Sequence, residues 1–195
     1  MKKNNFLKVI ASSLIKNKTT IKKYSGNFSL KDNRFDPIIV NSLYALEKSL
    51  LHLNVSIAKD TMILGVTNSG CKKFIEKVTE GISKVQPRPA FFVRSGAQTL
   101  ATYPATALQT HGCAITLSCN NLKFKYLCHI LEEYLYRYNN QHGIIIYSDY
   151  LEDDIVSVAL IISKSDADDT SLVKNYNKNT REAIIDIAEI NLLKE

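Results

Sequence analysis

The stretch that decides the fold is Gly112–Leu127, which reads GCAITLSCNNLKFKYL. Its first half contains AITLS (114–118), an apolar and β-branched run that is typical of a strand. The polar residues after it lead directly into an amphipathic pattern over about 122–138, which predicts a helix. Enzymes often present a nucleophile at such a strand-to-helix turn. Cys119 lies in this turn and is the first candidate for a catalytic thiol.

The predicted helix over 122–138 has one apolar face. Its members recur at three- and four-residue steps, and we expect them to be buried: Phe124, Leu127, Cys128, Leu131, Leu135 and Tyr138.

Upstream of the turn, the sequence alternates strand and helix patterns. FLKVIASSLI (6–15) and DTMILGVT (60–67) are predicted strands. Between them, Asp36-Pro37 resembles an N-cap followed by a first-turn proline, and this predicts a helix over about 37–53. A second helix is predicted after Gly70, with an apolar face made of Cys71, Phe74, Ile75, Val78, Ile82 and Val85.

The residues just before Gly112 predict one more helix. Ala97, Ala101 and Ala105 form a stripe of small residues that permits close approach of another backbone. Pro104 is expected to kink this helix or to begin its second part, and Gly112 is expected to cap it.

Downstream of the turn, HGIIIYS (142–148) and IVSVALIIS (155–163) are predicted strands, the first buried on both faces. A polar loop over 164–180 leads to REAIIDIAEINL (181–192), whose isoleucine content favours a strand. This order predicts an α/β domain with a mainly parallel sheet and helices on its faces.

Composition restricts the class of function. The net charge is +6 over 195 residues, yet 1–31 hold eight lysines and no acid, so the rest carries −2. This basic arm is either a solvated surface or a contact for an acidic partner. We expect no nucleic-acid binding, because few aromatic residues interrupt the lysines and no recognition motif is present.

Location and cofactors follow from what the sequence lacks. No apolar run approaches the roughly 20 residues that span a bilayer, and the N-terminus has too short an apolar stretch for a signal peptide. We therefore expect a cytoplasmic protein whose four cysteines are free thiols. No cofactor or metal is expected, and the acidic run at Asp149 and 152–154 is interpreted as a solvated hairpin rather than a metal site.

The ordered elements resemble a known family. TMILGVTNSGC (61–71), FFVRSGAQTLATYPATALQTHGCAITLS (91–118), GIIIYSDY (143–150) and VSVALIIS (156–163) are together similar to the N-terminal half of β-ketoacyl synthases, condensing enzymes of the thiolase-like fold. EAIIDIAEINL also resembles the strand that ends that half in the family. The resemblance covers about 34–192.

The resemblance implies a fold and a domain organisation. The fold is an α/β, thiolase-like half with a five-stranded mixed sheet between helices. The chain then consists of a basic N-terminal arm with the first strand (1–33) and a β-ketoacyl synthase N-terminal-like domain (34–195), in one globular domain overall.

The same resemblance bears on the candidate site. Counted from Gly112, the family's cysteine comes two residues after Cys119, so Asn121 takes the nucleophile position. Family members with a replaced cysteine are chain-length factors, which pair with an active ketosynthase and do not condense. The chain is accordingly expected to be a non-condensing accessory or assembly subunit in fatty-acid, polyketide or aryl-polyene-type synthesis.

The resemblance also implies partners. In the family the strand before the nucleophile pairs across a dimer twofold, which makes Ala114–Ser118 an interface strand. The chain is expected to form a homodimer or a heterodimer with a ketosynthase subunit. An acyl carrier protein is a further expected partner, because such carriers are acidic and the N-terminal arm is basic.

Two alternatives stay open. In the first, Cys119 is acylated and a partner chain supplies the histidines that the family carries in its second half. We expect no pair between Cys119 and any of the four histidines, which are His52, His111, His129 and His142. His129, for example, is ten residues past Cys119 on the next helix, about 15 Å of helical rise away. In the second, the chain is a binding module unrelated to acyl chains.

Overall fold

The computed structural model describes residues 6–17, 35–51, 53, 57–84, 96–118, 121–152, 154–167 and 169–192. The elements follow in this order: β1 (Phe6–Asn17), α1 (Pro37–Leu51), β2 (Met62–Thr67), α2 (Lys72–Ser83), α4 (Thr99–Ala107), β3 (Ala114–Ser118), α5 (Phe124–Arg137), β4 (His142–Leu151), β5 (Asp154–Ser165), α6 (Thr170–Asn175) and α7 (Thr180–Leu192).

The five strands form one sheet in the order β1-β5-β4-β2-β3. β2 runs parallel to both β3 and β4, whereas β4–β5 and β5–β1 are antiparallel. The α/β class and the five-stranded mixed sheet are confirmed, although parallel pairings do not dominate. β1 and β3 are the two edge strands.

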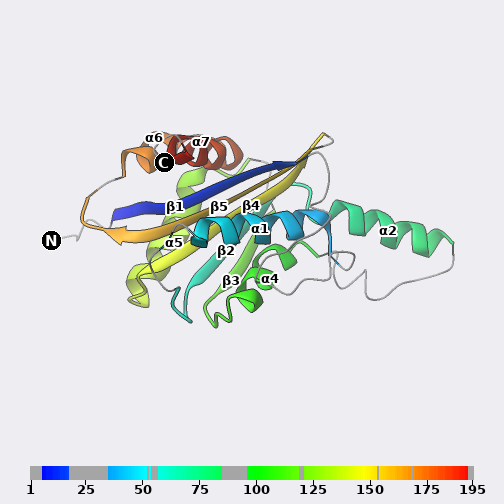
Figure 1. Cartoon of the computed structure of the whole chain (residues 1–195), viewed down its shortest axis with the longest axis horizontal. Coiled ribbons are helices and arrows are strands. Elements are labelled where there is room, and N and C mark those ends of the chain that lie inside the picture. The colour runs from blue at the N-terminus through cyan, green and yellow to red at the C-terminus, as the bar shows by residue number, and fades with distance from the viewer. Residues whose placement is uncertain are drawn as a thin grey trace.

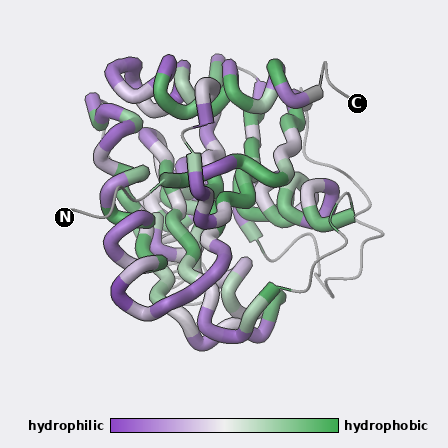
Figure 2. Tube along the Cα trace, turned by 90° about the vertical axis from the view of Figure 1, so that its left-hand side faces the viewer, coloured by the Kyte–Doolittle hydropathy of each residue, from purple (hydrophilic) through white to green (hydrophobic). Residues whose placement is uncertain are grey.

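Helices cover both faces of the sheet (Figure 1). α1 and α4 pack on one face, while α5 and α7 pack on the other. β4 shows why its sequence is continuously apolar: Ile144 and Ile146 belong to the core under α1 and α4, whereas Ile145 and Tyr147 belong to the core under α5 and α7. Its predicted burial on both faces is confirmed, and Figure 2 shows hydrophobic segments gathered between the layers.

The start of α1 confirms the predicted cap. Asp36 Oδ1 accepts a hydrogen bond from the Ile38 N–H (3.1 Å), and the Asp36 carbonyl accepts one from the Ile39 N–H (2.9 Å). Pro37 occupies the first helical position, where its missing N–H costs nothing.

The small-residue stripe of α4 does what its sequence predicts. Ala101 and Ala105 are buried against the sheet. A Cβ added to Gly65 of β2 would lie 3.2 Å from the Ala101 nitrogen, so glycine allows the close approach of helix and strand. Pro104 lies inside α4.

The predicted cap of α4 is wrong. Gln109, with φ of 54°, takes the left-handed position, and the Thr110 N–H donates to the Ala105 carbonyl (2.9 Å) in a Schellman arrangement. Gly112 has another role. A Cβ there would lie 2.3 Å from the Thr61 carbonyl oxygen, so glycine lets the chain pass beside the residues that precede β2.

The C-terminal segment is the largest correction. Residues 181–192 were expected to form a strand, but they lie in α7. Ala183, Ile184, Ile187 and Ala188 are buried, which is one face of a helix at steps of one, three and four residues. The isoleucine content favours a strand locally, and packing of this face against the sheet overrides that preference. The likeness of this segment to the family's closing strand is therefore wrong.

Three smaller predictions also differ. Tyr138 at the end of α5 is 59% exposed rather than buried. The polar loop after β5 contains the short helix α6. α2 forms as predicted, but only Phe74 of its apolar face is buried within the helix, and Ile75 and Ile82 are exposed. Val85 lies outside the described residues.

Within the described ranges, no helix combines the length and the apolar character needed to cross a membrane.

Candidate functional site

The candidate site is the turn between β3 and α5. Asn121, the residue at the predicted nucleophile position, is described and exposed in this turn. Cys119, the alternative nucleophile, lies outside the described residues. Thr180, the first residue of α7, holds the turn, because its N–H (2.9 Å) and its hydroxyl (2.6 Å) both donate to the Leu122 carbonyl.

The first amides of α5 are already bonded. The Phe124 N–H donates to the Lys178 carbonyl (3.2 Å), and the Lys125 N–H donates to the Tyr176 carbonyl (3.1 Å). These are donors that a helix N-terminus normally leaves free for an anion. The residues between α6 and α7 therefore consume the groups that a condensing enzyme would use to stabilise a thiolate or an oxyanion.

The described histidines do not gather at this turn. His111 precedes β3 and His142 begins β4. Both therefore lie at the N-terminal ends of the parallel strands, whereas Ser118 lies at the C-terminal end of β3. Burial lowers the pKa of His142 and favours its neutral form. His52 lies outside the described residues. Because Cys119 lies outside them too, the expected lack of a cysteine–histidine pair stays a prediction.

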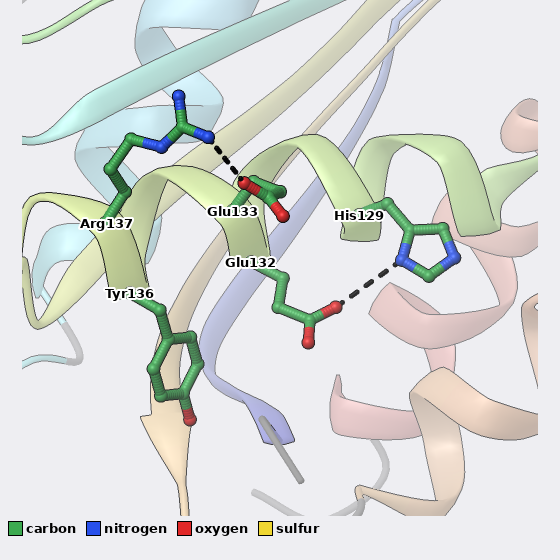
Figure 3. A pocket seen from close by; sticks show the side chains of 5 residues that line it. All are labelled: His129, Glu132, Glu133, Tyr136 and Arg137. Carbon is green, nitrogen blue, oxygen red and sulfur yellow. Dashed lines mark hydrogen bonds and ion pairs between the residues drawn. The ribbon is translucent and has the colours of Figure 1, made fainter. Parts of the chain in front are cut away.

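His129 lies on the outer side of α5, where its side chain is exposed to solvent (Figure 3). Its Nδ1 lies 3.4 Å from Glu132 Oε2, and Arg137 Nη2 lies 3.3 Å from Glu133 Oε2. With Tyr136, these residues line a shallow hollow. The His129, Glu133 and Arg137 side chains are largely exposed, and such ion pairs contribute little stability. Searched over the described residues, no group of three metal-ligating side chains is found.

Asp149 is a buried carboxylate, although the sequence predicted that it would be exposed to solvent. It was expected in a solvated hairpin, yet it is 3% exposed. Its carboxylate accepts hydrogen bonds from the N–H groups of Asn68 (2.9 Å) and Ser69 (3.0 Å), and also from the Ser69 hydroxyl. Asp149 therefore holds the loop after β2, beside the carboxyl ends of the parallel strands.

The hairpin itself is as predicted. Leu151 pairs with Asp154, and Glu152 adopts a left-handed conformation with φ of 56°. Tyr147 donates its hydroxyl to Asp149 (3.4 Å). Burial, followed by the nearby Asp149 charge, raises the pKa of Tyr147, so the phenol stays protonated and acts as a donor.

A second buried network joins the end of β4 to the starts of α1 and α2. Asp36 accepts hydrogen bonds from the Tyr150 hydroxyl (2.5 Å) and the Phe74 N–H (3.0 Å). Burial raises the pKa of Asp36 despite these bonds. The sequence predicted Asp36 only as the N-cap of α1. In the structure its carboxylate also accepts a hydrogen bond from α2.

The buried cysteines are structural. Burial raises the pKa of Cys71 to about 11 and that of Cys128 to about 12, so neither is a thiolate at neutral pH. Cys71 Sγ lies 3.2 Å from the Thr99 hydroxyl oxygen. The predicted packing role is confirmed for both. Cys113, at the start of β3, is a free and exposed thiol.

No family model matches the chain, and no curated protein matches it. Solved structures do. A chain from the complex of the ketosynthase ApeO with its chain length factor ApeC, from Xenorhabdus doucetiae, has a TM-score of 0.65 and 9% identity, with coverage of 82% of this chain and 79% of that one. The ishigamide ketosynthase/chain length factor has a TM-score of 0.63 and 10% identity, with coverage of 89% and 61%.

A third neighbour is ketosynthase twelve from the bacillaene polyketide synthase of Bacillus amyloliquefaciens. It has a TM-score of 0.57 and 9% identity, and the match covers 80% of this chain and 41% of that one. This chain thus spans less than two thirds of the second and third neighbours. The chain has the thiolase-like fold of a ketosynthase half, as the order of its sequence elements predicted.

Proposed function

We propose that the chain is a non-condensing ketosynthase-like subunit of fatty-acid, polyketide or aryl-polyene-type synthesis. The observation that carries this proposal is the β3–α5 turn. By the resemblance, Asn121 takes the position of the family's cysteine, and the first amides of α5 are bonded to the residues before α7. An amide side chain cannot form the acyl thioester on which condensation depends.

The arrangement of histidines supports the same proposal. Decarboxylation of an extender needs a hydrogen-bonding or basic group beside the reacting carbon. Of the described histidines, His111 and His142 lie at the N-terminal ends of the parallel strands, opposite Ser118, and His129 lies on the outer side of α5. In this proposal the active ketosynthase partner supplies the chemistry, and the chain contributes a surface.

The proposed contact surface is the open edge of β3. The Ile63 N–H donates to the Cys113 carbonyl (2.9 Å), so Cys113 points its backbone groups toward β2. Parallel ladders alternate, and Ala114, Thr116 and Ser118 therefore point their N–H and C=O groups away from the sheet. Among the described residues no strand pairs with these groups, and a second chain that adds a strand would bond them.

Acylation tests the proposal directly. The Cys113→Ser chain is incubated with an acyl-carrier thioester or a cerulenin-like alkylator, and its intact mass is measured. This background removes the exposed thiol of Cys113. We expect no adduct. An adduct that disappears when Cys119→Ser is added would establish the alternative, in which Cys119 is acylated and a partner supplies the histidines.

A gain-of-thiol variant is the matched control. Asn121→Cys in the Cys113→Ser background places a thiol where the family has one. We expect alkylation at the ordinary rate of an exposed thiol, without the acceleration that a helix N-terminus gives, because the Phe124 and Lys125 amides are occupied. Rapid acylation of this variant would show that the site is intact apart from its nucleophile.

The proposal includes an acyl carrier protein that docks on the basic arm, and a cytoplasmic location in which the thiols stay reduced. Deletion of 1–31 would not test the docking cleanly, because β1 is a strand of the sheet. Substitution of Lys18, Lys22, Lys23 and Lys31 by Gln removes charge without removing β1. We expect weaker carrier binding in isothermal titration, and unchanged binding would remove this part of the proposal.

A further inference from the structure

α2 extends away from the sheet, beyond the end of α1 (Figure 1). Its first turn is anchored to the rest of the chain. The Phe74 N–H donates to Asp36 Oδ2 (3.0 Å), and Lys73 Nζ lies 5.6 Å from the centre of the Tyr150 ring. Past Phe74, no residue in the described range 75–84 is buried. The described part of the chain therefore holds α2 at its base and leaves the remainder largely open to solvent.

The apolar side of α2 is exposed. Because a helix turns about 100° per residue, Ile75, Val78 and Ile82 lie within an arc of about 60° and form one apolar row. Ile75 is 47% exposed and Ile82 is 62% exposed, while Val78 is half-buried. The apolar stripe of a helix in a globular protein normally faces the core. This row faces outward, which indicates a surface suited to contact with something apolar.

Charged side chains are distributed unevenly around the same helix. Lys72 and Lys77 lie at the two borders of the predicted apolar face, each about 110° from its centre, whereas Glu80 lies about 170° away. Lys77 Nζ is 5.0 Å from the centre of the Phe74 ring, so this lysine extends along the apolar side. Border lysines of this kind reach the phosphate groups of a bilayer while the apolar row enters the acyl chains, and an acid on the opposite side stays in water.

Charge also favours a lipid surface over a second copy of this helix. Residues 72–84 contain four lysines and two glutamates. Two such helices would bring like net charges together, whereas anionic headgroups complement the lysines. The eight lysines of 1–31, which no acid accompanies, would add attraction to the same kind of surface.

We infer that α2 binds an anionic lipid surface and lies parallel to it. Ile75, Val78 and Ile82 enter the acyl chains, and Lys72 and Lys77 contact the phosphate groups. The contact is peripheral, and its anchored first turn would hold the sheet beside the membrane. The inference goes beyond the proposed function and depends on neither Asn121 nor β3.

Vesicle flotation is the first test. The chain is mixed with vesicles of phosphatidylcholine that contain about one quarter phosphatidylglycerol, or with phosphatidylcholine alone. We expect it to float with the anionic vesicles. Ile75→Gln/Ile82→Gln should lower the partition coefficient by more than about 10-fold, because two exposed isoleucines no longer leave water. Val173→Gln/Ile190→Gln, which changes exposed apolar residues of α6 and α7, is the matched control and should change nothing.

The orientation of α2 is the second test. A nitrobenzoxadiazole label is attached to Ile82→Cys or to Glu76→Cys in a Cys113→Ser/Cys119→Ser background, in which the remaining cysteines are buried. With anionic vesicles, the label at residue 82 should brighten and be quenched by nitroxide on the acyl chains. The label at residue 76, about 150° from the centre of the apolar face, should remain unquenched.

Several results would overturn the inference. One is a chain that does not float with anionic vesicles. Another is an unquenched label at residue 82, as expected if 85–95, a second copy or another protein covers the apolar row. A third is flotation that survives Ile75→Gln/Ile82→Gln but is lost when the arm lysines are replaced, which would assign lipid binding to the arm alone. Those arm variants are Lys18→Gln, Lys22→Gln, Lys23→Gln and Lys31→Gln together.

Discussion

The two edges of the sheet are built differently. β1 is an edge strand whose backbone is engaged by side chains: the Tyr136 hydroxyl bonds both the N–H and the C=O of Phe6 (3.3 Å each), and Asp169 Oδ2 accepts from the Val9 N–H (3.1 Å). A register irregularity follows between Val9 and Ala11. β3 is also an edge strand, yet within the described residues its backbone has no such attachments.

The difference between β1 and β3 concerns which edge of the sheet can pair with a strand of another chain. Natural sheets blunt an edge with bulges, lysines and covering side chains, because unpaired backbone groups recruit further strands. β1 carries these features, including the exposed Lys8 and Lys16. β3 carries an uncharged sequence beside an apolar groove that Ile115, Ile130 and Tyr134 line. One edge is closed and the other is suited to pairing.

Removal of one outward amide from β3 should have the largest effect. Thr116→Pro eliminates an N–H that faces away from β2, a position where an edge strand tolerates proline. We expect a dimer that uses this edge to weaken by about 30-fold, since in a symmetric pair two hydrogen bonds of about 1 kcal/mol each are lost. Analytical ultracentrifugation measures the change. Thr116→Val keeps the amide and should leave the dimer intact.

Loss of the Asp169 carboxylate should leave the Val9 N–H of the edge strand β1 without its acceptor. Asp169→Ala removes the acceptor of the Val9 N–H and the cap of α6, where the Ser171 N–H donates at 2.8 Å. We expect a loss of about 1–3 kcal/mol in the free energy of unfolding by urea. Asp166→Ala, in the exposed loop before α6, is the control. A loss below about 0.5 kcal/mol would mean that Asp169 does not protect β1.

The pH dependence of stability should distinguish Asp169 from a buried aspartate away from either edge. Hydrogen bonds from Ser171 and Val9 lower the pKa of Asp169 despite its partial burial, so its contribution is present above the unfolded pKa and is lost as pH falls through the folded value. Burial raises the pKa of Asp36, so its contribution falls as pH rises from the unfolded value toward the folded one.

Asn variants measured at pH 3.5 and pH 6.5 test these opposite signs. Relative to the native chain, Asp169→Asn should lose more stability at pH 6.5 than at pH 3.5. Asp36→Asn should compare more favourably at pH 6.5 than at pH 3.5. Urea denaturation at each pH gives the differences, and equal changes in both variants would contradict the assignment.

The smallest effect is expected from Tyr136→Phe. This change keeps the ring and removes the hydroxyl that bonds Phe6. We expect a loss of about 0.5–1.5 kcal/mol, seen as faster amide hydrogen exchange at the start of β1. Tyr126→Phe, on the exposed surface of α5, should leave that exchange unchanged.

Much of the fold was predictable because its signals are local. Each of these signals lies within one short segment. They are the cap at Asp36-Pro37, the continuously apolar run of β4 and the repeating apolar residues of α5. The site was predictable only in outline. The place of Asn121 came from the resemblance, whereas the bonds from the Phe124 and Lys125 amides depend on residues more than fifty positions away.

The sequence by itself determined the order of strands and helices from β1 to β5 and the turn at Asn121, since each is written within a few consecutive residues. Only the tertiary structure decided that 181–192 is a helix, that Asp149 is buried, and which edge of the sheet is closed. The physical reason is distance along the chain. Val9 meets Asp169 and Asn68 meets Asp149 across 160 and 81 positions, and no local pattern records such partners.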